Sequence, residues 1–289
     1  MSAVTLQQLL EAGTHFGHQT KRWNPKMKRY ILCQRNGIYI VDLNKTIEGL
    51  DRFVARVKDE IHKGGKVLFV GTKKQIKECI REEADRCGMP SVTERWLGGM
   101  LTNFQTIRQS IRKLEKIEKM ETDGTLQALP KKEILLLQKK KAKLLCVLGG
   151  IRDLRKLPAI IFAVDTVKEH IAIDEGRALG IPIGAIVDTN CDPEKIDYPI
   201  PGNDDAIKSI QLITTAVVDA IVQMRDAIPK ELSEQKEGAK PEPEVKVELD
   251  GEEAVEEIAE IETLPEGGTQ KIKSHRVVRK KMVKAPDEE

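Results

Sequence analysis

The stretch AIIFAVDTVKEHIAIDEGRALGIPIGAIVDTN, residues 159–190, decides the fold. It begins with a short apolar run at 159–166 and ends with a second one at 181–190, and both are rich in isoleucine or valine without strict alternation. Runs of this kind are typical of parallel strands that helices cover on both faces. The segment between them, 167–180, has the pattern of an amphipathic helix. The stretch therefore predicts a β-α-β unit with two parallel strands.

The same alternation of strands and helices continues outside this unit. KVLFVGT, at 66–72, predicts a third buried strand, and Asn-Gly at 36–37 predicts a tight turn between two short strands within 30–43. Strands that alternate with amphipathic helices predict an α/β fold with a doubly wound parallel sheet. The further helices are expected at 46–64, 73–88 and 204–228.

Two amphipathic segments do not fit into this sheet. Segment 104–120 carries an apolar stripe at helical spacing, and segment 131–150 carries another. A turn that contains glycine and proline joins them, which predicts an inserted antiparallel coiled-coil hairpin, 104–148. The other faces are dense with charge, so the hairpin is either a solvated excursion or a docking arm for RNA or protein. The stripes comprise Ile107, Ile111, Leu114 and Ile117, then Ile134, Leu137, Lys141, Leu144 and Leu148.

Charge is distributed unevenly along the 289 residues. The net charge is +2, but residues 230–289 contain 11 Lys/Arg against 17 Asp/Glu, which leaves the rest of the chain basic. The tail has too few large apolar residues to offset its ordering entropy, so we expect it to be disordered, with helical spacing only around 252–261. The folded body is then an α/β RNA-binding domain made of 1–103 and 149–229, with the hairpin between its two parts.

The composition favours a reduced, cytoplasmic protein. No apolar run approaches the roughly 18 residues that span a bilayer, and the opening MSAVTLQQLLEAG lacks the pattern of a secretory signal. The five cysteines are scattered without a CxxC pair, which argues against a disulfide framework and against a structural zinc knuckle. We therefore expect no membrane contact.

The sequence offers one weak nucleotide-binding pattern and no catalytic signature. VGTKKQ, 70–75, follows a strand and opens a helix, where phosphates often bind, but it has a single glycine. A nucleotide-binding α/β enzyme would have to use this loop with Asp165 or Asp188, which follow strands at the edge where such sheets bind ligands. Helix N-capping is the preferred interpretation of both aspartates. We assign no catalytic residue and no small-molecule substrate.

One pair of histidines could hold a divalent metal. His15 and His18 could share a helical face or a turn, and Asp188, Asp204 and Asp205 could complete the coordination shell. Two imidazoles with carboxylates would suit zinc better than magnesium. An isolated HxxH pattern is weak evidence, so two polar loop histidines without any cofactor remain the preferred interpretation.

Two clusters of basic and aromatic residues favour RNA binding. KRWNPKMKRY, 21–30, and RWLGGMLTNF, 95–104, each contain an Arg-Trp pair, and no other tryptophan occurs in the chain. Long cations reach phosphates, aromatic rings stack on bases or riboses, and glycines allow close backbone approach. The alternative for either cluster alone is a solvated basic loop with a packed ring. The predicted RNA contacts are Lys21, Arg22, Trp23, Asn24, Lys26, Lys28, Arg29, Lys73, Lys74, Arg95, Trp96, Gly98, Gly99, Thr102 and Asn103.

Several long motifs resemble the bacterial small-subunit ribosomal protein number two family. They run in order over about residues 5–228 and include GTHFGHQTKRWNPKMKRYI, VLFVGTKKQ, RWLGGMLTNF, PAIIFAVDTVKEHIAIDEGRALGIP, VDTNCDP and IPGNDDA. The resemblance implies a flavodoxin-like parallel α/β domain with a protruding coiled-coil hairpin, and no enzymatic activity.

The same resemblance implies the partners. Members of the family bind ribosomal RNA in the small ribosomal subunit and are needed for the large messenger-binding ribosomal protein number one to attach. The two Arg-Trp clusters and the 104–148 hairpin would then contact RNA, whereas nothing is implied for the tail beyond about residue 229. Two alternatives stay open, namely the nucleotide-dependent enzyme and a protein scaffold that uses the hairpin and tail without RNA.

Overall fold

The computed structural model describes the backbone of residues 4–238 and the side chains of 4–126 and 129–227. Its central sheet has five parallel strands in the order β5-β4-β6-β7-β8. Counted along the chain, this is the order 2-1-3-4-5 of flavodoxin-like folds. The strands are β4 (Val67–Val70), β5 (Ser91–Val92), β6 (Ile160–Val164), β7 (Ile183–Val187) and β8 (Tyr198–Pro201).

The three predicted strands and the β-α-β unit of 159–190 are confirmed. The sequence pattern does not predict β5 or β8, because β5 has only two residues and β8 reads YPIP. Proline cannot donate to a strand ladder and is confined mainly to the edges of sheets. Both strands lie at the two edges of this sheet.

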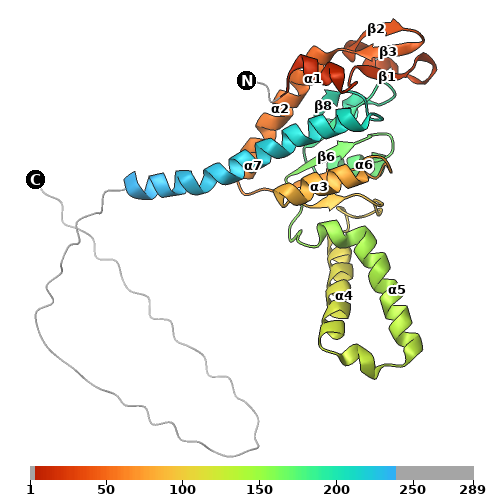
Figure 1. Ribbon diagram of the computed structural model, residues 1–289, viewed down its shortest axis with the longest axis vertical. Helices are drawn as coiled ribbons and strands as arrows, with labels where there is room; N and C mark the ends of the chain where they lie inside the picture. The colour runs from red at the N-terminus through yellow and green to blue at the C-terminus, as the bar shows by residue number, and fades with distance from the viewer. Residues whose placement is uncertain (1–3, 239–289) are drawn as a thin grey trace, which may run out of the picture. The chain divides into compact units, whose positions relative to one another are not determined.

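Helices cover both faces of the sheet, as a doubly wound fold requires (Figure 1). Within β4, Val67 and Phe69 join a hydrophobic cluster with α2, α3 and α7, whereas Leu68 and Val70 join a second cluster on the opposite face. The second cluster includes α6, Trp96 and the ends of α4 and α5 nearest the sheet. The helices of the domain are α2 (Leu43–His62), α3 (Lys77–Cys87), α6 (His170–Ala178) and α7 (Ile207–Gly238).

Helix α7 corrects the predicted start of the tail. The predicted boundary lies at Pro229, yet the helix continues through this proline to Gly238. A proline removes one helical hydrogen bond, but the residues after it, KELSEQKE, are mostly strong helix formers. The predictions for 239–289, including the short helix around 252–261, lie outside the described residues. By length and composition 207–227 could cross a membrane, but half of that stretch is buried inside the protein.

The N-terminal segment forms a second, antiparallel sheet in the order β1-β3-β2. Asn36 and Gly37 both have positive φ, 51° and 75°, as the predicted tight turn requires. A Cβ on Gly17 would lie 2.6 Å from Cγ2 of Thr189, so β1 lies directly against the loop that follows β7. The elements are α1 (Leu6–Glu11), β1 (Phe16–Gln19), the 3-10 turns η1 (Thr20–Arg22) and η2 (Pro25–Tyr30), β2 (Ile31–Arg35) and β3 (Ile38–Val41).

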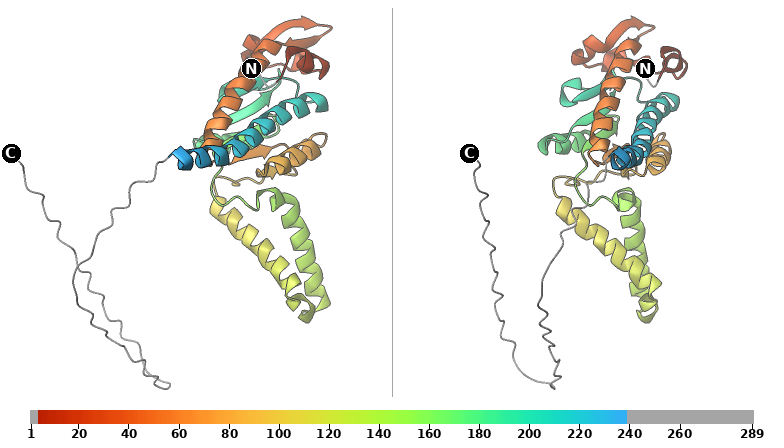
Figure 2. Two further views of the ribbon diagram at one scale, coloured as in Figure 1. Left: turned by 60° about the vertical axis from the view of Figure 1, so that its left-hand side comes forward. Right: turned by 90° about the vertical axis from the view of Figure 1, so that its left-hand side faces the viewer.

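Helices occupy both segments of the predicted hairpin. They are α4 (Phe104–Thr122) and α5 (Lys131–Leu148), which contact each other and extend away from the sheet (Figure 2). All four stripe residues of α4 are buried, and those of α5 are buried or half-buried. A coiled-coil geometry stays a prediction. The short elements η3 (Thr125–Ala128), η4 (Gly149–Ile151) and η5 (Pro193–Lys195) complete the described chain.

Candidate nucleic-acid interface

Lys73 lies where the carboxyl ends of three parallel strands meet. It follows β4, and its Nζ is 2.6 Å from Oδ1 of Asp205, 3.2 Å from Oδ1 of Asp204 and 3.5 Å from Oδ2 of Asp165. Burial alone would lower the pKa of Lys73, but these carboxylates raise it. Because the ammonium points at the protein's own aspartates, this geometry argues against RNA contact by Lys73. The neighbouring Lys74 is exposed.

His18, in β1, lies beside this group of aspartates. Its Nδ1 is 2.9 Å from Oδ2 of Asp188, and its Nε2 is 3.5 Å from Oδ2 of Asp205. Ligand atoms of His18, Asp188 and Asp204 lie within 4.8 Å of one another, close enough to share one cation. The hydrogen bond to Asp188 raises the pKa of His18. Four of the five predicted metal residues therefore lie together, and the metal itself stays a prediction.

His15 does not join them. The expected helical face is wrong, because the chain enters strand β1 at Phe16. His15 itself lies in the turn before the strand, and it is not among the residues whose ligand atoms gather at His18. The His15 ring stands 3.9 Å, centroid to centroid, from that of Phe16, and burial lowers the pKa of His15. Within residues 4–238 its Nδ1 is buried without a hydrogen-bond partner.

The aspartates after β6 and β7 are not simple helix N-caps. Asp188 accepts a hydrogen bond from the backbone N–H of Thr189 at 2.5 Å, and a loop rather than a helix follows it. Asp165 accepts from the N–H of Lys168 at 3.1 Å, but the N-cap residue of α6 is Glu169. The N-cap interpretation is therefore wrong for both. Asp165 instead closes a turn ahead of α6, with a left-handed φ of 67° that aspartate tolerates better than most residues.

The VGTKKQ loop is occupied by a buried carboxylate of the protein itself. Glu169 accepts hydrogen bonds from the N–H and the hydroxyl of Thr72, at 3.0 and 2.5 Å. The Nζ of Lys168 donates to the carbonyl of Thr72 at 2.7 Å. The N–H of Thr72 and the ammonium of Lys73 are therefore already bonded within the protein, and a nucleotide phosphate would have to displace these carboxylates to use them. This geometry argues against the nucleotide-binding alternative.

The first predicted RNA cluster, 21–30, is anchored to the domain at its centre. Met27 is fully buried, and the N–H of Asn24 donates to the carbonyl of Thr189 at 2.8 Å. Trp23 is half-buried, with its ring centroid 5.0 Å from that of Tyr39. Around this anchor the exposed cations are Lys21, Arg22, Lys28 and Arg29.

Lys26 differs from these four cations. Its Nζ lies 2.5 Å from Oε2 of Glu194 and 3.0 Å from Oδ2 of Asp192, and both carboxylates raise its pKa. The pair connects the basic segment to η5. A phosphate would have to compete with two carboxylates for Lys26. Among the described side chains the other four cations have no carboxylate partner, so the geometry favours them as RNA contacts.

The second cluster forms a loop, 95–103, and the ring of its tryptophan is buried rather than exposed. Trp96 is only 7% exposed and packs in the hydrophobic cluster on the α6 side of the sheet. Its indole N–H donates to Oε1 of Glu175 at 3.0 Å. Trp23 therefore has a partly exposed ring, as stacking on RNA requires, whereas Trp96 has the packed ring of the alternative interpretation. Arg95, the residue before it, is exposed.

The polar groups of this loop divide into an inward and an outward set. The N–H and the hydroxyl of Thr102 donate to Glu175, as does the N–H of Gly99, so these groups point into the protein. Gly99 has φ +84°, which explains the glycine. A Cβ on Gly98 would meet nothing within 4 Å, so the space above Gly98 is open. Arg95, Gly98 and Asn103 therefore form the outward set.

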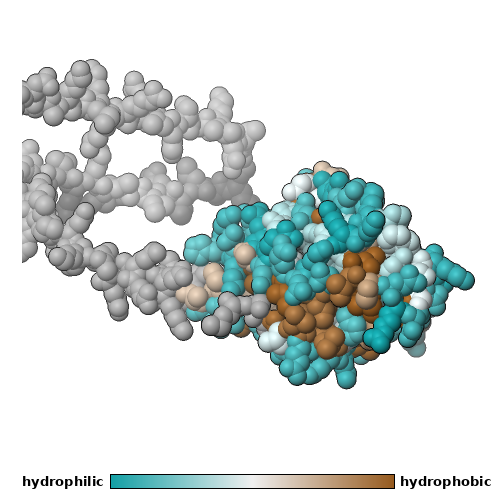
Figure 3. Space-filling view, turned by 90° about the horizontal axis from the view of Figure 1, so that it is seen from above, coloured by the Kyte–Doolittle hydropathy of each residue, from teal (hydrophilic) through white to brown (hydrophobic). Residues whose placement is uncertain are grey.

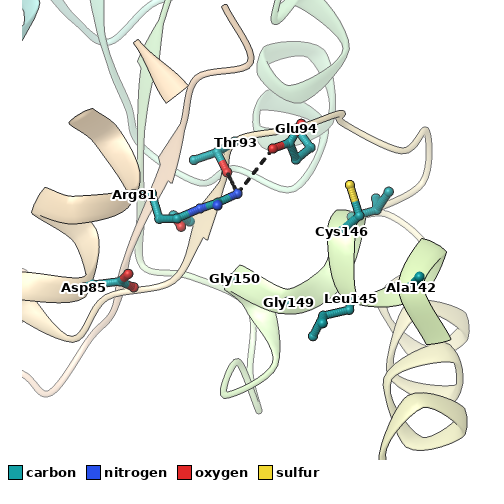
Figure 4. A pocket seen from close by; sticks show the side chains of 11 residues that line it. Arg81, Asp85, Thr93, Glu94, Ala142, Leu145, Cys146, Gly149 and Gly150 are labelled. Carbon is teal, nitrogen blue, oxygen red and sulfur yellow. Dashed lines mark hydrogen bonds and ion pairs between the residues drawn. The ribbon is translucent and has the colours of Figure 1, made fainter. Parts of the chain in front are cut away.

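A cavity of about 510 Å³ lies between the base of α5 and the end of β5. In Figure 4, Arg81 reaches toward Thr93 and Glu94 on one side, and Leu145 and Cys146 face it from the other. The cavity has an apolar wall from α5 and a charged wall from α3. Sequence reasoning does not find it, because no single segment carries a pattern for it.

Exposed apolar side chains mark a further part of the surface. Seen from above, hydrophobic atoms gather on a face that is otherwise hydrophilic (Figure 3). RNA offers little to a purely apolar patch, whereas protein partners bury such patches. Large exposed hydrophobic residues of the N-terminal elements are Leu6, Leu10, Phe16 and Leu32.

A comparison with known families finds a match over most of the chain. The family model described as ribosomal protein S2 matches residues 9–224. The match includes both Arg-Trp clusters, the aspartates around Lys73 and the two helices α4 and α5.

Proposed function

The chain belongs to the ribosomal protein S2 family, and from this we propose that it binds small-subunit ribosomal RNA through its two Arg-Trp clusters. The family is a structural, non-enzymatic one of the cytoplasmic small ribosomal subunit. Association with ribosomal RNA and with other ribosomal proteins follows from membership. What we propose is which residues of this chain make these contacts.

One observation carries the assignment of the RNA surface. Met27 of the first cluster and Trp96 of the second pack in the same hydrophobic cluster, on the α6 side of the sheet. Two basic segments far apart in the sequence are therefore anchored to one layer of the domain. The exposed cations around these anchors are Lys21, Arg22, Lys28, Arg29 and Arg95.

The binding is expected to be chiefly electrostatic. The exposed set consists of lysine and arginine, and Gly98 leaves room for a sugar-phosphate backbone. Phosphate contacts position a protein on RNA without reading its bases. The logarithm of the association constant should then fall by somewhat under one unit per neutralised phosphate for each tenfold rise in salt.

We further propose that the exposed apolar face of the N-terminal elements contacts a protein. By family resemblance the partner is the large messenger-binding ribosomal protein. Leu10 and Leu32 are 53% and 67% exposed, and hydrophobic atoms gather on the face seen in Figure 3, which is typical of a surface that binds a protein. The helices α4 and α5 are proposed to contact RNA, since α5 carries many lysines on its exposed positions.

The test is removal of one arginine at a time. Arg22→Ala and Arg95→Ala should each weaken binding to purified small-subunit RNA and incorporation into the subunit, and the double variant should lose more than either. Their thermal midpoints should stay nearly unchanged, because exposed charges contribute little to folding. Each variant should also reduce the salt slope by about one phosphate contact.

Arg52→Ala is the matched control. Arg52 is 60% exposed and lies on α2, which packs on the opposite face of the sheet. Its removal takes away the same charge and should leave RNA binding intact. Normal incorporation of both single variants together with a clear fall in thermal midpoint would mean that the clusters are structural and that the RNA surface lies elsewhere.

A further inference from the structure

Five hydrogen bonds converge on the carboxylate of Glu175, in helix α6. The donors to Oε1 are the indole N–H of Trp96 at 3.0 Å and the N–H of Gly99 at 2.8 Å. The donors to Oε2 are the N–H of Leu101 at 2.9 Å and the N–H and hydroxyl of Thr102 at 3.0 and 3.1 Å. All five come from residues 96–102, so one side chain of α6 holds the whole loop.

This arrangement is an anion site that the protein fills with its own carboxylate. Successive N–H groups of a loop that curve around one point form a concavity that binds anions. Here the concavity closes on Glu175, which is 8% exposed. Burial alone would raise the pKa of Glu175, but the hydrogen bonds from Thr102, Trp96, Leu101 and Gly99 outweigh it and lower the pKa. The carboxylate is therefore ionised at neutral pH.

We propose that Glu175 is a positioning residue for the RNA contact of the 95–103 loop. This inference rests on the proposed function. By binding the inward donors, Glu175 fixes the loop so that Arg95, Gly98 and Asn103 face outward. It also removes those donors from competition for phosphate, which leaves the arginine side chain as the main phosphate contact of the loop.

The orientation of Arg95 follows from its neighbour. Trp96 is held both by the apolar cluster and by its N–H bond to Glu175, so the backbone at 95 has little freedom. A loop backbone that is fixed before binding loses less conformational entropy on binding, and this raises affinity without adding a contact. Loosening the loop should therefore weaken RNA binding even though Glu175 itself does not touch RNA.

The test compares three full-length variants. Glu175→Gln keeps the size of the side chain but replaces one acceptor oxygen by a donor. Glu169→Gln is the control for a buried carboxylate of the same region, since Glu169 bonds to Thr72 rather than to the loop. Asp174→Asn is the control for charge on α6, because Asp174 is 54% exposed and pairs with Lys195.

Two measurements are made on each variant. Amide hydrogen exchange should become several-fold faster at Gly99, Leu101 and Thr102 in Glu175→Gln alone, while the amides of β6 and β7 keep their protection. Affinity for purified small-subunit RNA should fall in Glu175→Gln and not in the two controls. Adding Arg95→Ala should then reduce the affinity for RNA much less in the Glu175→Gln background than in the native chain, because the effects of coupled residues are not additive.

The outcomes distinguish the role of Glu175 from the RNA contact of the loop. Unchanged exchange in the loop, or an equal cost of Arg95→Ala in both backgrounds, overturns the role of Glu175 while the RNA function stands. A loosened loop together with no effect of Arg95→Ala on the native chain overturns the RNA contact instead. Should Glu175→Gln fail to fold, Glu175→Asp keeps the charge on a shorter stem, and it should loosen the same three amides to a smaller degree. Native exchange at those amides in Glu175→Asp would also overturn the proposal.

Discussion

Glu169 and Glu175 are buried carboxylates at the same helix, yet their pKa values are shifted in opposite directions. Burial raises the pKa of Glu169, and two hydrogen bonds from Thr72 do not compensate for it. Glu175 is also penalised by burial, but five donors from the 96–102 loop outweigh that penalty and lower its pKa. Glu175 has five donors against two, it is slightly less buried than Glu169, and Asp165 raises the pKa of Glu169 further, so all three differences favour the ionised form of Glu175.

At the residue scale, this difference predicts opposite pH dependences of stability. A lowered pKa means that the stability from Glu175 is fully present above its unfolded value of 4.5 and is lost as pH falls through the folded pKa. The stability gap between the native chain and Glu175→Gln should therefore be constant near neutral pH and shrink below about pH 4.5. Denaturant unfolding at a series of pH values measures the gap.

For Glu169→Gln, the stability gap to the native chain should change with pH in the opposite direction. Its pKa is raised, so the native chain gains stability relative to this variant as pH falls through the folded pKa toward 4.5. Near neutral pH, Glu175→Gln should lower the free energy of unfolding by about 2–4 kcal/mol. At least one charge-assisted hydrogen bond is lost, and the NH₂ group of the glutamine faces an N–H donor of the loop. Parallel curves for the two variants would contradict at least one of the two pKa assignments.

A further prediction at the residue scale concerns metal binding by His18, Asp188 and Asp204. Burial and the charges of Asp188 and Asp165 raise the pKa of Asp204 to about 6, so negative charge is in excess even with Lys73 present. Zinc and magnesium are each titrated into the native chain by calorimetry, and because a histidine binds metal only when neutral and the pKa of His18 is raised, zinc affinity should fall as pH is lowered. His18→Ala should abolish the heat, and His15→Ala should not, because His15 lies outside the group. Equal zinc binding by both variants would rule the site out.

At the scale of elements, α4 and α5 have a small hydrophobic core of their own. Leu114 and Ile117 of α4 are buried, yet neither belongs to the two clusters that pack on the sheet. Their burial comes from contact between the two helices, which the structure shows to pack together. The part of the pair far from the sheet should therefore be able to unfold separately from the α/β domain.

Leu114→Ala should destabilise this pair by about 2–5 kcal/mol, because it removes a fully buried side chain and leaves a cavity. Hydrogen exchange should rise in α4 and α5 and stay low in β6. Leu136, on α5, is 60% exposed, so Leu136→Ala serves as the control and should change stability by about 0.5 kcal/mol or less. A global loss of protection in Leu114→Ala would show that the pair and the sheet unfold as one unit.

At the scale of the whole molecule, charge separates the folded body from the end of the chain. Residues 239–289 hold 9 Lys/Arg and 14 Asp/Glu, whereas the proposed RNA surface is basic. RNA repels net negative charge, so this segment is not expected to contribute to the contact. The end of α7 at Gly238, rather than Ile228, is the boundary at which it can be removed without cutting a helix.

A chain that ends after Gly238 should incorporate into small subunits as well as the full chain does. Its affinity for purified RNA should be equal or slightly higher, since the removed segment is net acidic. The two chains are compared at low and at moderate salt, because any repulsion is screened at the higher concentration. Failure of the shortened chain to incorporate, with an unchanged thermal midpoint, would assign an assembly role to the removed residues.

Local patterns in the sequence predict the elements of this fold because their signals lie within single segments. The apolar runs at 66–72, 159–166 and 181–190 mark buried strands, and Asn36-Gly37 marks a turn, because burial on both faces and a positive φ each require particular residues at particular positions. Helix α7 shows where such a signal misleads. The expected helix of 204–228 stops before Pro229, but the helix continues to Gly238 through KELSEQKE, which consists mostly of strong helix formers.

The sequence by itself determined the parallel α/β sheet, the two inserted helices and the basic character of the two Arg-Trp clusters. Only the tertiary structure decided which groups in these clusters face outward. Trp96 and Thr102 are bound inward by Glu175, a residue more than seventy positions away, and Lys73 is bound by three aspartates from other strands. Residue type limits what a side chain can bind, whereas the partner that it meets depends on how distant strands and helices are brought together.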